Sequence, residues 1–231
     1  MKKNEIVQLL KGIKLVISAL LLIPCMSSIA VAQGSLSAHL GPAFPMGAFA
    51  DDADFDVHGA AGIGLGVGAQ YVHSLSDNGL GLFGGLDIIF NGLNNDIKNM
   101  FKDENPGSSF TFEKYINIPI SAGVHYLYGV NDGVDIYGKV GLTASFLKMT
   151  KFLWEEPGDD DFIETYNLSV TAGFLFGAGV ILNDQIEVGL SVMGLGKHTV
   201  MADLEYGSDT DTFEFERKVA LFNLTFGYML Q

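Results

Sequence analysis

The sequence predicts an all-β fold, an eight-stranded antiparallel up-and-down transmembrane β-barrel. Three observations support it: strict alternation of apolar residues, short turn signals at regular intervals, and the absence of a long apolar run. The alternation is clearest in 219–230, where one set of alternate residues is wholly apolar or aromatic: Ala220, Phe222, Leu224, Phe226, Tyr228 and Leu230. Side chains on a strand alternate between two faces, so one face of this strand is apolar and the other is small or mixed. An apolar exterior around such an interior is typical of a barrel in lipid.

The strands follow from the turn signals at 76–79, 131–133 and 183–185, which contain Asn-Gly, Asp-Gly and Asn-Asp steps. Asn-Gly and Asp-Gly steps favour tight hairpins because they tolerate positive φ. Three short turns and four longer loops join an even number of strands, as in bacterial outer-membrane barrels, so the turns should face the periplasm and the loops the outside. The expected strands are 35–44, 60–74, 80–91, 112–128, 134–147, 166–182, 186–195 and 217–230.

The outward faces of these strands carry no charge in the two longest examples. The fourth strand presents Ile116 through Tyr126 at alternate positions, and the sixth presents Leu168 through Val180. A charge there would cost about 2–4 kcal/mol at mid-membrane. A soluble lipocalin-type barrel would show the reverse polarity, with apolar residues inside.

The first 32 residues predict a cleaved signal peptide. Four lysines precede or adjoin an apolar core at 15–23, and Ala30-Val31-Ala32 offers a cleavage site. The apolar core is too short for the roughly 20 residues of a spanning helix. The alternative, lipidation at Cys25, fits poorly because Ile23-Pro24 precede this only cysteine. The barrel domain is therefore expected over 33–231.

The composition of 33–231 limits the classes of function. Removal of four lysines and one glutamate with the leader leaves 9 basic and 26 acidic residues, a net charge of −17. The mean hydropathy of the whole chain is nevertheless +0.29, and no later run reaches 18 apolar residues. Without a basic patch, nucleic acid is not an expected partner.

Several segments resemble small outer-membrane β-barrel families, including the OmpX-like and PorT-like barrel domains. The segments are 41–47 (GPAFPMG), 115–120 (YINIPI) and the last strand 222–230 (FNLTFGYML). The resemblance implies a bacterial outer-membrane location and recognition of the last strand by the barrel-insertion machinery. It also suggests, through the PorT-like members, an accessory role in secretion.

The barrel interior is predicted to be filled rather than open. Gly62, Gly64, Gly66 and Gly68 should face inward and make room for bulky neighbours, because eight-stranded barrels are usually packed by side chains. A narrow channel or ligand pocket is the alternative. The few inward charges are expected to form a polar network in the lumen, either a structural plug or a proton path: Asp87, Asp135, Lys139 and Glu187.

The loops carry most of the acidic residues and are the expected contact surface. The candidates for loop contacts are Asp52, Asp54, Asp56, Trp154, Asp159, Asp160, Asp161, Asp209 and Asp211. The spacing of the first three resembles the start of a calcium loop, but Val57 and Ile63 stand where the glycine and glutamate are needed. No cofactor is expected, although weak binding of Ca²⁺ or Mg²⁺, bridging to lipopolysaccharide phosphates, stays open. Aromatic residues of the loops either pack the loops together or anchor a partner.

No catalytic group emerges from the sequence. His73-Ser74 superficially resembles the pair of a barrel lipase but falls at a periplasmic turn, and His198 is expected in the fourth loop near Glu205. The leading hypothesis is a non-enzymatic outer-membrane barrel whose acidic loops serve envelope integrity, adhesion or binding of a surface protein. The alternatives are a lipid A-modifying enzyme, a narrow porin-like channel and a secretion accessory barrel. Outer-membrane lipid and lipopolysaccharide are expected neighbours in every case.

Overall fold

The computed structural model describes residues 34–52 and 58–230. Four features predicted from the sequence lie outside them: the signal peptide, Cys25, Asp54 and Asp56. No helix among the described residues combines the length and apolarity needed to cross a membrane.

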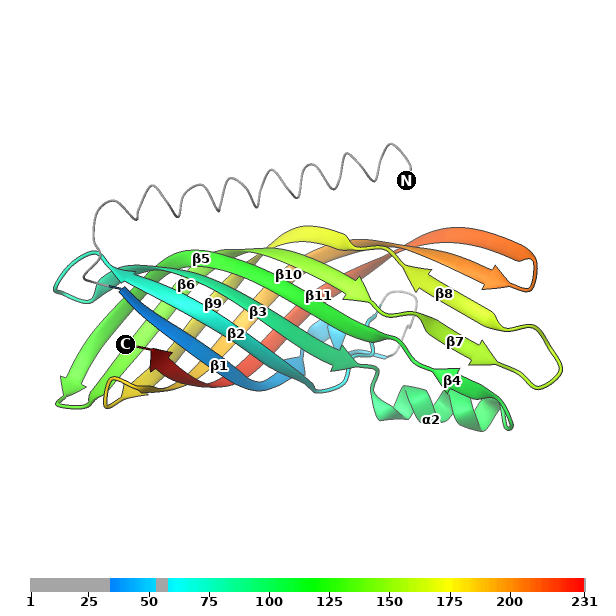
Figure 1. The fold of residues 1–231 in the computed structure, drawn as a ribbon, viewed down its shortest axis with the longest axis horizontal. Helices are drawn as coiled ribbons and strands as arrows, with labels where there is room; N and C mark the ends of the chain where they lie inside the picture. Colours follow the sequence, from blue (N-terminus) through cyan, green and yellow to red (C-terminus); the bar gives the residue numbers. More distant parts are fainter. Residues whose placement is uncertain (1–33, 53–57, 231) are drawn as a thin grey trace.

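Eight long strands of the described chain form a closed ring (Figure 1). Each is antiparallel to its neighbours. In ring order they are β1 (Gly34–Pro45), β2 (Gly64–Ser74), β3 (Leu80–Gly92), β5 (Lys114–Asn131), β6 (Val134–Met149), β9 (Ser169–Leu182), β10 (Ile186–Tyr206) and β11 (Asp209–Leu230). The last strand closes on the first, from Leu36 opposite Leu230 to Pro45 opposite Leu221. The predicted fold class is confirmed.

The three short turns lie where the sequence predicts them. Gly79 and Gly133 have φ values of 88° and 101°, and Asn183 and Asp184 have 51° and 57°. These conformations strain most side chains but suit glycine and asparagine, which is why the turn residues set the hairpin positions.

An apolar belt covers the outside of the ring. Leu65, Leu142 and Phe176 are each more than half exposed, as are further residues that alternate with buried ones along the same strands. Such exposure would be unfavourable in water but is what lipid requires. The belt therefore marks the membrane-spanning part of the molecule.

The longer connections differ from the simple loops that we predict. β10 and β11 continue as one hairpin to Tyr206 and Asp209, so the expected strands 186–195 and 217–230 are too short. Three further strands extend the sheet beyond the belt: β4 (Ser109–Thr111), β7 (Phe152–Glu155) and β8 (Phe162–Tyr166). The helix α2 (Asn95–Glu104) and the short 3-10 helix η1 (Gly47–Phe49) complete this extension of the ring (Figure 1). Alternation continues past the membrane here because the inward side chains of the extension pack on the same core that fills the ring.

The lumen is filled by side chains, as the sequence predicts. Phe83, Tyr137 and Leu175 are at most 5% exposed. An added Cβ at Gly68 would lie 2.3 Å from the Asp87 carboxylate, so this glycine makes room for a lumenal side chain. Gly64 does the same for Asn91.

We predict that Gly123→Ala destabilises the barrel and that Gly138→Ala does not. A Cβ at Gly123 would lie 2.0 Å from the Val140 carbonyl oxygen, whereas nothing lies within 4 Å at Gly138. Forcing an atom into packed backbone costs about 1–3 kcal/mol. Urea unfolding in detergent micelles checks this, and equal midpoints for the two variants would contradict the packing at the β5–β6 pair.

Candidate functional site

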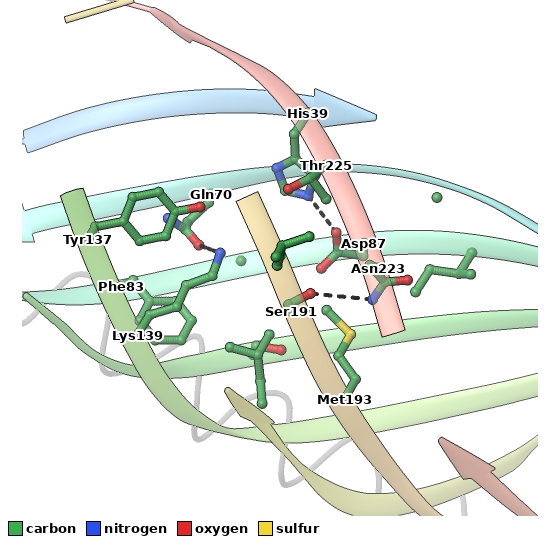
Figure 2. A pocket seen from close by; sticks show the side chains of 16 residues that line it. His39, Gln70, Phe83, Asp87, Tyr137, Lys139, Ser191, Met193, Asn223 and Thr225 are labelled. Atoms are coloured by element: carbon green, nitrogen blue, oxygen red, sulfur yellow. Dashed lines mark hydrogen bonds and ion pairs between the residues drawn. The ribbon is translucent and has the colours of Figure 1, made fainter. Parts of the chain in front are cut away.

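The lumen contains a small polar cavity of about 20 Å³ near the middle of the ring. That volume accommodates about one water molecule. Side chains from β1, β2, β3, β6, β10 and β11 point into it (Figure 2). The cavity is therefore a gap within a packed interior, and a second gap of about 70 Å³ lies nearer the short turns, beside Gln70, His125 and Glu187.

Two close polar contacts connect strands across this cavity. The Lys139 Nζ donates to the Gln70 side-chain oxygen at 2.6 Å, and His39 Nε2 lies 2.6 Å from Asp87 Oδ1 (Figure 2). The Asn223 amide donates to the Ser191 hydroxyl at 3.4 Å. These contacts satisfy buried polar groups that would otherwise cost free energy.

The charged residues predicted to form one network in the lumen do not all contact one another. Lys139 bonds to Gln70, although the charges of Glu187 and Asp87 act on it from nearby. Glu187 is 6% exposed and lies within hydrogen-bonding reach of Tyr137, whereas Asp87 pairs with His39. Asp135 lies at the periplasmic end of β6, beside the turn, and only partly buried. The structure thus brings Lys139, Asp87 and Glu187 into one region and leaves Asp135 at its edge.

His39 and Gln70, the partners of Asp87 and Lys139, are not predicted from the sequence. Both stand at inward positions of an alternating strand, where a polar side chain requires a partner, and that inward placement was a usable signal. Which strand supplies the partner depends on barrel register, which the alternation alone does not give.

His198 lies in the barrel interior and not in a loop, which corrects the sequence-based placement. It is fully buried on β10, and its Nε2 lies 3.2 Å from the Ser145 hydroxyl. The error arose because β10 continues past residue 195 after a register shift between Gly194 and Gly196. No acidic side chain among the described residues hydrogen-bonds to this pair, so it lacks the third member of a catalytic triad.

The extension is rich in aromatic residues that join the same core as the side chains of the lumen. Trp154 stacks on Phe110 with ring centroids 5.8 Å apart, and Phe101 contacts Phe110 and Phe152 at about 6 Å. Trp154, a predicted contact residue, therefore points into this core. The aromatic residues pack the extension together rather than standing free as anchors.

A group of buried ionisable side chains lies at the base of the extension. Glu113 and Arg217 are 3% and 5% exposed, and Arg217 stacks over the Phe215 ring at 4.4 Å. The pKa of Glu113 rises from 4.5 to about 7, chiefly through burial, with a smaller contribution from the Glu164 carboxylate, while a backbone hydrogen bond and the charge of Arg217 oppose the rise. Burial also raises the pKa of Glu164, which accepts a hydrogen bond from the Tyr166 hydroxyl.

Most of the described acidic loop candidates are exposed. Asp52 and Asp159 to Asp161 are solvent-exposed, as are Asp209 and Asp211 on the outer half of β11. Tyr206 donates to Asp159 at 2.8 Å, which lowers the pKa of this aspartate and joins the β7–β8 connection to the β10–β11 hairpin. Among the described residues, no three histidine, cysteine or acidic side chains are grouped closely enough to hold a metal ion.

Comparison with known proteins decides the family. The model of the outer membrane protein beta-barrel domain matches residues 18–229, almost the whole chain. The chain belongs to this family. No curated protein sequence matches it.

Solved structures of outer-membrane barrels share the fold at low sequence identity. OprG from Pseudomonas aeruginosa is 12% identical, with 86% of this chain and 97% of OprG covered at a TM-score of 0.50. A major outer membrane protein from Thermus thermophilus is 15% identical, with 85% and 99% covered at 0.50. Neisserial surface protein A is 14% identical, with 85% and 96% covered at 0.42. Family and fold together identify an integral outer-membrane barrel protein of bacteria.

We predict that Lys139→Met weakens this outer-membrane barrel by about 3 kcal/mol, because it removes a buried cation whose charge interacts with the buried Glu187. Adding Glu187→Gln should restore part of that loss. Thermal unfolding in detergent, followed by heat-dependent gel mobility, measures both effects. An unchanged midpoint for Lys139→Met would contradict a stabilising lumenal network.

We predict that Glu113→Gln stabilises the extension most at high pH. Since the folded state raises the pKa of Glu113, folding favours its protonated form. The wild-type extension therefore loses stability as pH rises from about 4.5 to about 7, by about 3 kcal/mol in total. Glu113→Gln should remove this loss, so that its advantage is present at pH 8 and small at pH 4.5.

Fluorescence of Trp154, the single tryptophan, reports unfolding of the extension for this test. The exposed Glu214 supplies the control, because Glu214→Gln removes the same charge from a solvated site. An equal pH response in wild type and Glu113→Gln would contradict the buried placement of this carboxyl.

Proposed function

We propose that the protein is a non-enzymatic surface-binding barrel whose extracellular extension captures an extended segment of a partner protein. The membrane-spanning ring holds the extension above the lipid, and the lumen only stabilises it. The observation that carries the proposal is the free edge of β11 over 209–216.

The outer half of β11 has a partner on one side only. β10 pairs with it up to the tip, where Tyr206 is opposite Asp209. On the other side, pairing with β1 ends at Pro45 and Leu221. Among the described residues no strand pairs with 209–216 along that edge. An unpaired edge presents backbone N–H and C=O groups that a further strand can use.

The side chains along this edge define which segment fits. Glu214 and Glu216 are exposed on one face, and Phe213 and Phe215 alternate with them on the other, where Phe215 packs on Tyr166 and Phe213 is 38% exposed beside Phe215. Asp209 and Asp211 add further negative charge near the tip. A complementary strand would alternate basic and apolar residues, with the basic residues opposite the glutamates.

Other functions receive less support. A channel needs an open lumen, and the gaps between the lumenal side chains, of about 20 and 70 Å³, have room for only a few water molecules. A lipid A-modifying enzyme needs a polar catalytic cluster at the outer-leaflet rim, and the buried His198–Ser145 pair is inside the barrel. We therefore expect lipid A from cells with and without the protein to have identical masses. A shift by one acyl chain would overturn the non-enzymatic assignment.

The edge is tested directly with Thr212→Pro. The Thr212 N–H donates to the Asp211 side chain at 2.7 Å, which places Thr212 among the residues whose backbone groups point toward the free edge. Proline removes this donor without removing a backbone bond to β10, and it also removes the bond from the Thr212 hydroxyl to the Asp203 side chain on β10 at 2.8 Å. The probe is an eight-residue peptide of alternating lysine and valine, titrated calorimetrically into the barrel in detergent micelles.

We expect the peptide to bind the wild type and to bind Thr212→Pro about tenfold more weakly. Thr212→Ser keeps both the N–H and the hydroxyl and should change binding by less than twofold. A matching peptide of glutamate and valine should not bind. Equal affinity of the proline variant, or no binding of the basic peptide to the wild type, would contradict strand addition at this edge.

A further inference from the structure

Four lysines stand on the outside of the ring, directly beyond the apolar belt. Lys114 and Lys148 lie on β5 and β6, and Lys197 and Lys218 lie on β10 and β11. All four are exposed. Lys114, Lys148 and Lys218 lie on the lipid-facing side of their strands, as Lys114 does at alternate positions with Ile116 and Ile118. The register shift at Gly194/Gly196 brings Lys197 to the same face.

The lysines form two pairs across neighbouring strands. Lys197 is directly opposite Lys218, an arrangement that places their Cβ atoms roughly 4.5–5.5 Å apart. Lys148 is opposite Ile116, so Lys114 lies diagonally from it at roughly 7–8 Å. Like charges directly opposite each other destabilise a sheet unless an anion lies between them.

The protein balances these charges only in part. Lys197 lies 2.5 Å from Glu216, and Lys148 donates to the Tyr166 carbonyl oxygen. No acidic side chain of the described residues forms an ion pair with Lys114 or Lys218. Residues 33–231 contain only nine basic residues against 26 acidic ones, so four cations on one outer rim are a marked asymmetry.

The height of the lysines matches the surface of the lipid. The stretch from Ile186 to Lys197 spans 12 residues, one of them the extra residue of the shift at Gly194/Gly196, which is close to the roughly 9–11 residues with which a tilted strand crosses the hydrocarbon. The short turns mark the periplasmic end, so the lysines lie at the outer-leaflet surface. Cations there attract phosphates of the surrounding lipid, whereas the acidic extension above would repel them.

We propose that the two lysine pairs bind phosphate groups of outer-leaflet lipid, with Lys197 and Lys218 as the stronger site. The site faces the lipid rather than a strand partner, and it touches the free edge of β11 only through the ion pair between Lys197 and Glu216. It anchors the ring at a fixed depth and shields the acidic extension from the anionic lipid surface.

Binding of lipid A to the barrel in dodecyl maltoside micelles tests the proposal. We expect the double variant Lys197→Gln/Lys218→Gln to bind lipid A about tenfold more weakly than wild type, with a smaller dependence on salt. Lys197→Arg/Lys218→Arg should keep the affinity. The matched control Lys98→Gln/Lys102→Gln removes the same charge from α2 and should change affinity by less than twofold.

Heat-dependent gel mobility shows that each variant is folded before the titration. The proposal is overturned if the α2 control loses as much affinity as the rim variant, which would indicate a net-charge effect. It is also overturned if lipid A lacking both phosphates binds equally well, or if millimolar inorganic phosphate displaces lipid A fully. The last result would indicate a site for soluble anions rather than for lipid.

Discussion

The hydrogen bonding between β11 and β1 is the constraint on which the rest of the structure depends. A strand in hydrocarbon has no water with which to pair its backbone, so an open sheet edge is not tolerated within the lipid. Closure from Leu36–Leu230 to Pro45–Leu221 removes that edge over the height of the apolar belt. Beyond Leu221 the environment is aqueous, and there β11 continues without β1. β11 is thus paired along both edges within the lipid and along only one edge above it, where a partner strand can bind.

Closure also explains the interior. A ring of eight strands leaves only enough space for side chains, so the lumen holds large residues such as Phe83 beside glycines that make room for them. The polar residues among them are satisfied locally by short contacts such as Lys139–Gln70 and His39–Asp87. These contacts connect strands that are distant in sequence and give the ring a rigid interior. A rigid ring is a suitable support for the extension, whose aromatic core holds the β10–β11 hairpin above the membrane.

The alternation in the sequence was sufficient to predict the ring, because a lipid-facing residue such as Phe176 and a lumenal residue such as Leu175 follow each other with period two. The three turns were equally predictable from Gly79, Gly133 and Asn183. The extension was not predictable, because its strands alternate in the same way as the membrane-spanning strands. The sequence pattern therefore does not show where the lipid ends. The register shift at Gly194/Gly196 then placed His198 inside the barrel, against expectation. The roles of loop residues such as Asp159 and Asp209 remain predictions about contacts, and Trp154 packs into the core of the extension.

The central claim is that the lipid ends near the lysine rim and that the aromatic extension lies in water above it. Quenching of tryptophan fluorescence by lipids with brominated acyl chains tests this most directly. Trp154, the single native tryptophan, should be quenched little, whereas a tryptophan at the belt position in Phe176→Trp/Trp154→Phe should be quenched strongly. Strong quenching of Trp154 would place the extension in the bilayer and contradict both the free edge of β11 and the position of the lysines.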